Sequence, residues 1–312
     1  MRDKGWLDQG SGRAALLLLG AVFALAVAGC GQPPPSEDGQ AEGGNAKGGE
    51  TTAEETTAEE TTTEETTSEE TTGTVAVGGS PELAEAAEGY EEYVVEQVAL
   101  LEERTEAFTG AVLAGDVEEA KRLFGPTREP WERIEPVAAS LGDYDPNIDA
   151  REGDVPDDEW RGFHRIEKAL WEENTTEGQD EYARQLMQDV TNLREDVEGL
   201  ELEPVDLVTG SVELLNEVSA GKITGEEDRY SHTDLYDINA NVEGSEVAGE
   251  DMGLANEVTA GFDDVYEELD QYRKGDGWVS YETLNEADRR ALSQKVDALA
   301  EPLSRVGQVL EG

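Results

Sequence analysis

Residues 160–171 read Trp160-Arg-Gly-Phe-His-Arg-Ile-Glu-Lys-Ala-Leu-Trp171 and carry a helical pattern of apolar residues. With successive residues 100° apart around a helix axis, the apolar side chains gather on one face. That face consists of Trp160, Phe163, Ile166, Leu170 and Trp171. The opposite face is charged and consists of Arg161, Arg165, Lys168 and Glu172. The pattern predicts a helix over residues 157–173 that packs its apolar face against other helices.

Two polar residues interrupt this pattern. Glu167 falls inside the apolar face, and His164, three residues earlier, falls at its edge. Residues three apart are neighbours on a helix, so both side chains point toward the same place. A carboxylate on an apolar face is costly unless it is paired, protonated or bound to a cation. The pair indicates either two ligands of a metal ion or a buried structural pair, and the two residues alone leave both interpretations open.

The rest of the chain from about Pro81 also reads as helical. Apolar residues recur at spacings of three and four over residues 82–114, which predicts one long helix. Gly, Pro and Asn residues separate further helices, which we expect at 116–124, 128–141, 157–173, 178–199, 204–220, 232–243, 252–273 and 285–308. No segment alternates as a strand does. We therefore expect an all-α fold of two helical bundles that share long helices.

The segment Gly162-Phe-His-Arg-Ile-Glu167 resembles the Gly-x-His-x-x-Glu motif of the imelysin-like family, and its surroundings resemble the family's iron-uptake members of the EfeM/EfeO type. The likeness continues, in the family's order, through residues 133–137, 147–152, 222–235 and 241–244. It covers about residues 81–312. Four separate motifs are more specific than one His-x-x-Glu, which occurs by chance in many helices.

The resemblance implies a pair of four-helix bundles with a metal-associated cleft between them that contains His164 and Glu167. It also implies extracytoplasmic binding of iron and its delivery to a membrane iron permease, with a haem-dependent peroxidase as a partner. The cargo is then iron, as Fe²⁺ or Fe³⁺, while copper and zinc remain open. The runner-up function is a metallopeptidase of the imelysin type, but the zinc-peptidase motif His-Glu-x-x-His is absent from the sequence. A structural or adhesion lipoprotein is a third alternative.

Further carboxylates are candidate metal ligands. Asp234 lies on the packing face of its helix with Asp237 and Asn241, although Ser231 to Asp234 also fits a capping box. Glu132, with Glu135, precedes a proline in a helix that we expect to pass near the cleft. Glu96 lies beside an apolar stripe of the first helix. Each glutamate is also compatible with a solvated surface position. We interpret His232, in the loop before Asp234, as a structural or surface histidine.

The N-terminal segment has the features of a lipoprotein signal. Arg2, Lys4 and Arg13 precede the apolar run 14–28, and Cys30 follows Val-Ala-Gly. A helix over this run would span roughly 22 Å, which is short of the hydrocarbon core of about 30 Å. We expect a signal peptide over 1–29, a lipid on Cys30, an acidic, disordered Thr/Glu-rich spacer over 30–80, and the helical domain over 81–312. The protein would then be extracytoplasmic and anchored to the cell membrane.

Composition excludes several classes of function. The 74 acidic residues outnumber 23 lysines and arginines, and the formal charge of −51 would repel nucleic acid. One cysteine cannot form an intrachain disulfide or a thiolate cage, and the chain has only two histidines. A bound metal must therefore be held by oxygen atoms and imidazole.

Overall fold

The computed structural model describes residues 81–251 and 256–310. The signal peptide, Cys30 and the spacer lie outside these residues. The described α-helices are α1 (Pro81–Ala114), α2 (Val117–Ile134), α3 (Tyr144–Ile148), α4 (Phe163–Lys168), α5 (Asp180–Asp196), α6 (Pro204–Ala220), α7 (Asp234–Asp251), α8 (Asn256–Leu269) and α9 (Glu286–Leu310). A π-helical segment, η2 (Ala169–Glu173), continues α4, and the 3₁₀ segments are η1 (Glu135–Leu141), η3 (Val197–Gly199), η4 (Lys222–Thr224), η5 (Asp270–Tyr272) and η6 (Tyr281–Thr283).

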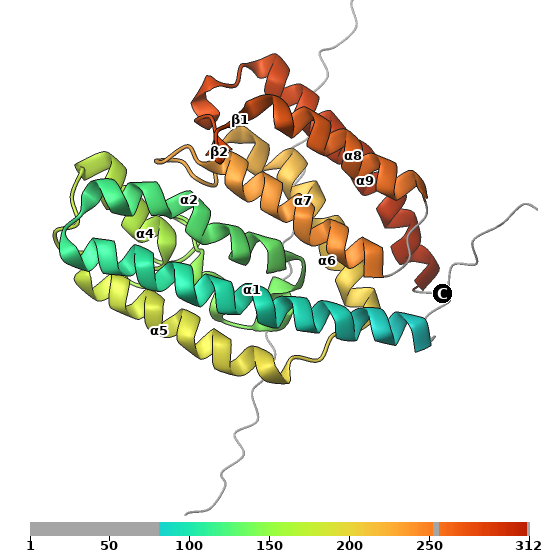
Figure 1. Cartoon of the computed structure of the whole chain (residues 1–312), viewed down its shortest axis with the longest axis horizontal. Helices are drawn as coiled ribbons and strands as arrows, with labels where there is room; N and C mark the ends of the chain where they lie inside the picture. The colour runs from blue at the N-terminus through green and yellow to red at the C-terminus, as the bar shows by residue number, and fades with distance from the viewer. Residues whose placement is uncertain (1–80, 252–255, 311–312) are drawn as a thin grey trace, which may run out of the picture. The chain divides into compact units, whose positions relative to one another are not determined.

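Two hydrophobic cores divide these helices into two bundles (Figure 1). In the first, α1 packs against α2 and α5, and α4 closes the core with Phe163 against Phe108 and Phe124. In the second, α6, α7, α8 and α9 pack against one another. Leu207 of α6 and Ala248 of α7 belong to the first core. The expected all-α pair of bundles with shared long helices is therefore confirmed.

The two bundles pack directly against each other through α2 and α7. At Gly244 of α7, a β-carbon would lie 1.9 Å from the carbonyl oxygen of Arg133 in α2. Only glycine allows the two helix backbones to come this close. The close contact brings α2 and α7 together, and these helices carry four of the ten residues of the site described below: Arg128, Glu132, Asp234 and Asp237.

The expected break between residues 124 and 128 is wrong, because α2 continues through Pro126 and Pro130. A proline removes one N–H donor from the helix and frees a carbonyl one turn earlier. The guanidinium of Arg104 donates to the Pro126 carbonyl, so the group freed by Pro130 is satisfied from α1. The helix expected over 157–173 begins only at Phe163, and a short helix, α3, occupies a segment that we expected to be a loop.

A two-stranded hairpin joins α8 to α9, with β1 (Arg273–Lys274) antiparallel to β2 (Gly277–Trp278). It is too short to show strand alternation in the sequence. In the described part of the chain, no helix combines the length and the apolar character that a bilayer span requires.

Candidate metal centre

A cluster of ten charged or titratable side chains is buried where the two bundles meet. Of the side chains that the structure describes, these are all the charged ones that are buried: Arg128, Glu132, Asp149, His164, Glu167, Lys222, Glu227, Asp228, Asp234 and Asp237. They come from α2, the end of α3, α4, η4, the loop after η4, and α7. Burying charge is costly, so the groups must satisfy one another or bind something else.

Gly162 sets the position of His164. It has a φ of +87°, and a β-carbon there would lie 2.3 Å from the carbonyl oxygen of Ile148. Only glycine fits this conformation and this contact. The start of α4 can therefore lie against the end of α3, and His164 comes next to Asp149, which follows Ile148.

His164 and Glu167 form the pair that the sequence predicts. The Nδ1 atom of His164 lies 2.9 Å from Oε2 of Glu167, and both side chains are almost fully buried. The other oxygen, Oε1, accepts hydrogen bonds from the backbone N–H groups of Tyr230 and Ser231 at 3.1 and 2.8 Å. Burial would raise the pKa of Glu167, but His164 and Ser231 lower it. Glu167 thus holds a negative charge and uses both oxygens.

The other imidazole nitrogen has no hydrogen-bond partner. Nε2 of His164 lies 3.6 Å from Oδ1 of Asp149 and 3.7 Å from Oε1 of Glu227. Burial and Arg128 lower the pKa of His164, but its interactions with Asp149, Glu167 and Glu227 raise it well above its usual range. Burial would raise the pKa of Glu227, but Lys222 and His164 lower it to about 2. Without a metal, the structure thus favours a protonated imidazole between ionised carboxylates.

Arg128 lies at the centre of the cluster and is fully buried. Its guanidinium contacts Glu132 and Asp149 in the first bundle. From the second bundle, Glu227, Asp228 and Asp237 approach it at 3.7, 3.6 and 3.5 Å. Burial works against its charge, yet these carboxylates raise the pKa of Arg128 well above its usual range. Arg128 is therefore a permanent cation that links carboxylates from both bundles.

Lys222 forms ion pairs with a second group of carboxylates. Its Nζ atom lies 2.9 Å from Glu132 and 2.7 Å from Glu135. The amide nitrogen of Asn241 donates to the same two carboxylates at 3.0 and 2.7 Å. Burial alone would lower the pKa of Lys222, but Glu132, Glu135 and Glu227 raise it well above its usual range. Glu132, a predicted ligand, is thus already held by Arg128, Lys222 and Asn241.

Three aspartates, one in the loop before α7 and two at the start of this helix, are less well satisfied. Oδ1 of Asp228, Oδ2 of Asp234 and both carboxylate oxygens of Asp237 are buried without a hydrogen-bond partner. Burial raises the pKa of Asp228 to about 6, and burial together with Asp228 raises that of Asp234 to about 8. Burial also raises the pKa of Asp237 well above its usual range. When no other cation is bound nearby, these carboxyl groups therefore tend to be protonated.

The cluster has far more acidic than basic groups. Seven buried carboxylates face two buried permanent cations, Arg128 and Lys222, while the partly exposed Arg151 lies 2.9 Å from Glu227 and His164 carries a further positive charge when protonated. Buried polar atoms are nearly always paired, so the unpaired oxygens and Nε2 of His164 indicate a missing partner. The chemistry of the donors, hard carboxylate oxygens and one imidazole, fits a di- or trivalent metal ion.

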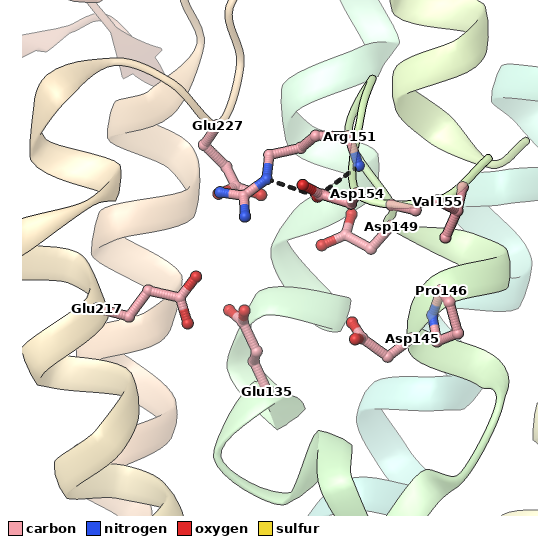
Figure 2. A pocket seen from close by; sticks show the side chains of 10 residues that line it. Glu135, Asp145, Pro146, Asp149, Arg151, Asp154, Val155, Glu217 and Glu227 are labelled. Atoms are coloured by element: carbon pink, nitrogen blue, oxygen red, sulfur yellow. Dashed lines mark hydrogen bonds and ion pairs between the residues drawn. The ribbon is translucent and has the colours of Figure 1, made fainter. Parts of the chain in front are cut away.

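A pocket of about 340 Å³ leads from the surface to this cluster. Figure 2 shows carboxylates from both bundles directed into it, with Glu217 of α6 across from Glu135 and Asp145. Asp149 and Glu227 line the pocket and also flank Nε2 of His164. The pocket therefore reaches the two carboxylates that flank Nε2, and Arg151 lines it beside Glu227.

The structure brings four of the five predicted ligands together: His164, Glu167, Asp234 and Glu132. Glu96 is exposed on α1 and is not part of the cluster. The alternative capping box at Asp234 is not formed, since Ser231 N–H donates to Glu167 and Asp234 accepts from Asp228 N–H. His232 is partly exposed and lies 3.5 Å from Glu282, in agreement with a structural or surface position.

Sequence reasoning did not identify Arg128, Lys222, Glu227 or Asp228 as members of the site. A signal existed for Arg128, which lies four residues after Phe124 and three before Trp131, two fully buried residues. This spacing places a charge on the apolar face of α2, but the expected break at residues 124–128 concealed it. Asp149 lies between the expected helices 128–141 and 157–173, where no helical periodicity places its side chain.

Comparison with known proteins agrees with this architecture. The family model described as Imelysin matches residues 86–306. Two proteins named iron uptake system component EfeO, from Escherichia coli K12 and Shigella flexneri, are each 45% identical to this chain over 241 residues. These matches cover 73% of this chain and 64% of each relative, so the chain spans less than two thirds of the length of these relatives.

A solved structure from Parabacteroides distasonis, described as a candidate iron-regulated protein A precursor, has a similar fold with a TM-score of 0.57. It is 15% identical in sequence, and the match covers 76% of this chain and 97% of that one. At this identity the likeness concerns the fold alone. The family model and the EfeO relatives together cover most of the helical domain, and the chain therefore belongs to the imelysin family.

Proposed function

We propose that this protein is the extracytoplasmic iron-binding component of an iron uptake system, which holds iron between its two bundles and delivers it to a membrane iron permease. The names of the EfeO relatives support the assignment to iron uptake. In this proposal Cys30 carries the lipid that anchors the chain to the membrane, and a haem-dependent peroxidase acts in the same system. Iron is cargo, and no chemical transformation is required.

One observation carries the proposal: within the described cluster, seven buried carboxylates and an imidazole share two buried permanent cations, Arg128 and Lys222, and one at the edge, Arg151. An iron ion would supply the missing positive charge. It would also displace protons from His164 and from carboxyl groups such as Asp234. Iron binding should therefore weaken as the pH falls, because protons and iron compete for the same atoms.

The donor set also suits a protein that must release its cargo. Carboxylates and one imidazole bind iron through hard oxygen atoms and a nitrogen, without a cage that encloses the ion. Arg128 contacts Asp149 and lies 3.7 Å from Glu227, so a metal ion beside these groups would have a positive charge as its neighbour. Repulsion between the two positive charges limits the affinity and favours release.

A metallopeptidase is the alternative function. Catalytic zinc sites commonly combine two or three histidines, or histidine with cysteine, and an open position for water. In the described part of the chain, His164 is the single histidine of the cluster, because His232 faces Glu282. This donor set favours metal binding over peptide hydrolysis.

The test is a calorimetric titration of the full chain with Fe²⁺ under argon, Fe³⁺ as its citrate complex, Cu²⁺ and Zn²⁺. We expect saturable iron binding that weakens at least tenfold in His164→Ala and Asp149→Asn. Asp157→Asn is the matched control, because this aspartate is exposed. Native iron affinity in His164→Ala, together with reduced thermal stability, would identify a structural ion pair and refute the proposed site.

Two further assays separate the functions. Metal-loaded protein incubated with casein and short peptides should release no fragments. Cleavage that disappears in His164→Ala would favour the peptidase instead. Iron-loaded protein added to vesicles that contain the permease should transfer iron into them, whereas iron-loaded Asp149→Asn should hold too little to transfer.

A further inference from the structure

We infer that the metal ion binds to Nε2 of His164, between Asp149 and Glu227, and that Glu167 is a positioning residue which receives the Nδ1–H hydrogen bond instead of binding the ion. This inference rests on the proposed function and concerns its geometry. The structure offers two groups of three residues close enough to share an ion: Asp149, His164 and Glu227, or His164, Glu167 and Asp228. The first group uses Nε2 and the second uses Nδ1.

The hydrogen bonds of Glu167 argue against the second group. Oε2 is 2.9 Å from Nδ1 of His164, and Oε1 accepts two backbone N–H groups, from Tyr230 and Ser231. An ion on Glu167 would have to displace one of these bonds and leave a buried donor unsatisfied, which costs about 1–3 kcal/mol. Glu167 therefore already has the partners that a buried carboxylate needs.

The surroundings of Nε2 favour the first group. This atom is buried and has no hydrogen-bond partner. Oδ1 of Asp149, which also accepts a hydrogen bond from Arg128, and Oε1 of Glu227 lie 3.6 and 3.7 Å away. Two ligand atoms that each lie about 2.1 Å from a tetrahedral ion are separated by about 3.4 Å. The distances from Nε2 to the two oxygens are therefore within a few tenths of an ångström of those in a tetrahedral site.

The residues that line the pocket also favour the first group. Asp149 and Glu227 line the acidic pocket (Figure 2), whereas Glu167 does not. An ion that enters through the pocket therefore meets Asp149 and Glu227, the carboxylates beside Nε2, before it meets Glu167. Asp228, the third member of the other group, is fully buried and lies 3.9 Å from Nδ1.

The position of Glu167 suits an orienting role. A carboxylate that accepts the second N–H of a metal-bound imidazole fixes the ring and directs the lone pair of the other nitrogen toward the ion. Glu167 also holds the backbone of residues 230 and 231, in the loop that carries Glu227. It thereby positions two ligands, His164 in the first bundle and Glu227 in the second.

Nitrogen-15 NMR of the full chain, labelled at histidine, tests the inference with zinc as a diamagnetic probe. The sequence contains only two histidines, and His232→Asn assigns the resonances. Asparagine tolerates the left-handed backbone at this position, where φ is +56°. With saturating zinc, we expect the coordination shift at Nε2 of His164 and a retained proton on Nδ1.

A coordination shift at Nδ1 would overturn the inference and leave the proposed iron site standing. Unchanged His164 resonances at saturating zinc would overturn both. Iron titrated into the zinc-loaded chain should release the zinc, and iron that binds without releasing it would also refute the shared site.

Glu167→Gln provides the second measurement. The amide keeps the size of the side chain and an oxygen for the backbone N–H groups, but its NH₂ group cannot accept the Nδ1–H bond. We expect zinc affinity to fall by about 10–100-fold, with an unchanged helical spectrum and with any remaining coordination at Nε2. Glu173→Gln, an exposed position in η2, is the matched control. Native zinc affinity in Glu167→Gln would refute the positioning role.

Discussion

Replacing Arg128 with Met removes the cation at the centre of the cluster while keeping a side chain of similar length. The guanidinium contacts or approaches five carboxylates: Glu132, Asp149, Glu227, Asp228 and Asp237. Removing one partner of a buried ion pair costs about 3–5 kcal/mol, because the other partner remains charged and buried. Some of the five carboxyl groups will take up protons in the variant. We therefore expect the free energy of unfolding to fall by about 3–5 kcal/mol in total, and not by that amount for each carboxylate.

For a domain of this size, a change of 1 kcal/mol shifts Tm by about 2–4 °C. The metal-free Arg128→Met variant should therefore unfold about 6–20 °C below the wild type. The matched control is Arg122→Met, on the same helix. Arg122 is exposed and pairs with Glu119 three residues away, and such surface pairs contribute about 0–1 kcal/mol.

Metal should reverse part of the loss. A divalent ion beside His164 supplies a positive charge where Arg128 supplied one, and it no longer faces the repulsion of the guanidinium. Thermal unfolding with and without zinc or Fe²⁺, followed by circular dichroism, should show a larger metal-induced rise of Tm in the variant than in the wild type. A metal-free variant as stable as the wild type would refute the reasoning, and so would a metal-induced rise no larger than that of the wild type.

Three other predictions concern the anchor, the fold and pH. Cys30→Ser should move the protein from the membrane fraction to the soluble fraction, and unchanged retention in the membrane would contradict the lipid anchor. Gly244→Ala should destabilise the fold by about 1–3 kcal/mol in urea unfolding, because its β-carbon would meet the Arg133 carbonyl, whereas Gly110→Ala, with open space around it, should be neutral or stabilising by up to about 1 kcal/mol. Between about pH 6.5 and 8, folded His164 and Asp234 hold protons that the unfolded chain has released. The metal-free chain should therefore lose stability as pH rises, by up to about 1.4 kcal/mol per pH unit for each group, and a gain in urea unfolding experiments would contradict this.

Periodicity in the sequence was sufficient for most helices, since α6 spans Pro204–Ala220 as expected and α1 differs by one residue. It failed where a distant side chain decides the outcome. At Pro130 of α2, the carbonyl that the proline frees accepts a hydrogen bond from Arg104 of α1. No local pattern contains that interaction.

In the candidate site too, the sequence predicted only the contacts that lie within one helix. His164 and Glu167 lie on one helix, so their spacing alone brings them together. Glu96 failed because buried Val94 and Val98 flank it two residues away on each side, which turns its side chain to the opposite face of α1. Glu227 lies in a loop without periodicity, and only the packing of the two bundles brings it to Nε2 of His164.

Diffraction from iron-loaded crystals at the iron absorption edge tests the central claim most directly, because the anomalous signal locates iron atoms alone. We predict one dominant peak between the two bundles, about 2.0–2.2 Å from Nε2 of His164 and in contact with Asp149 and Glu227. Peaks confined to surface carboxylates, with His164 still paired only to protein groups, would contradict the account.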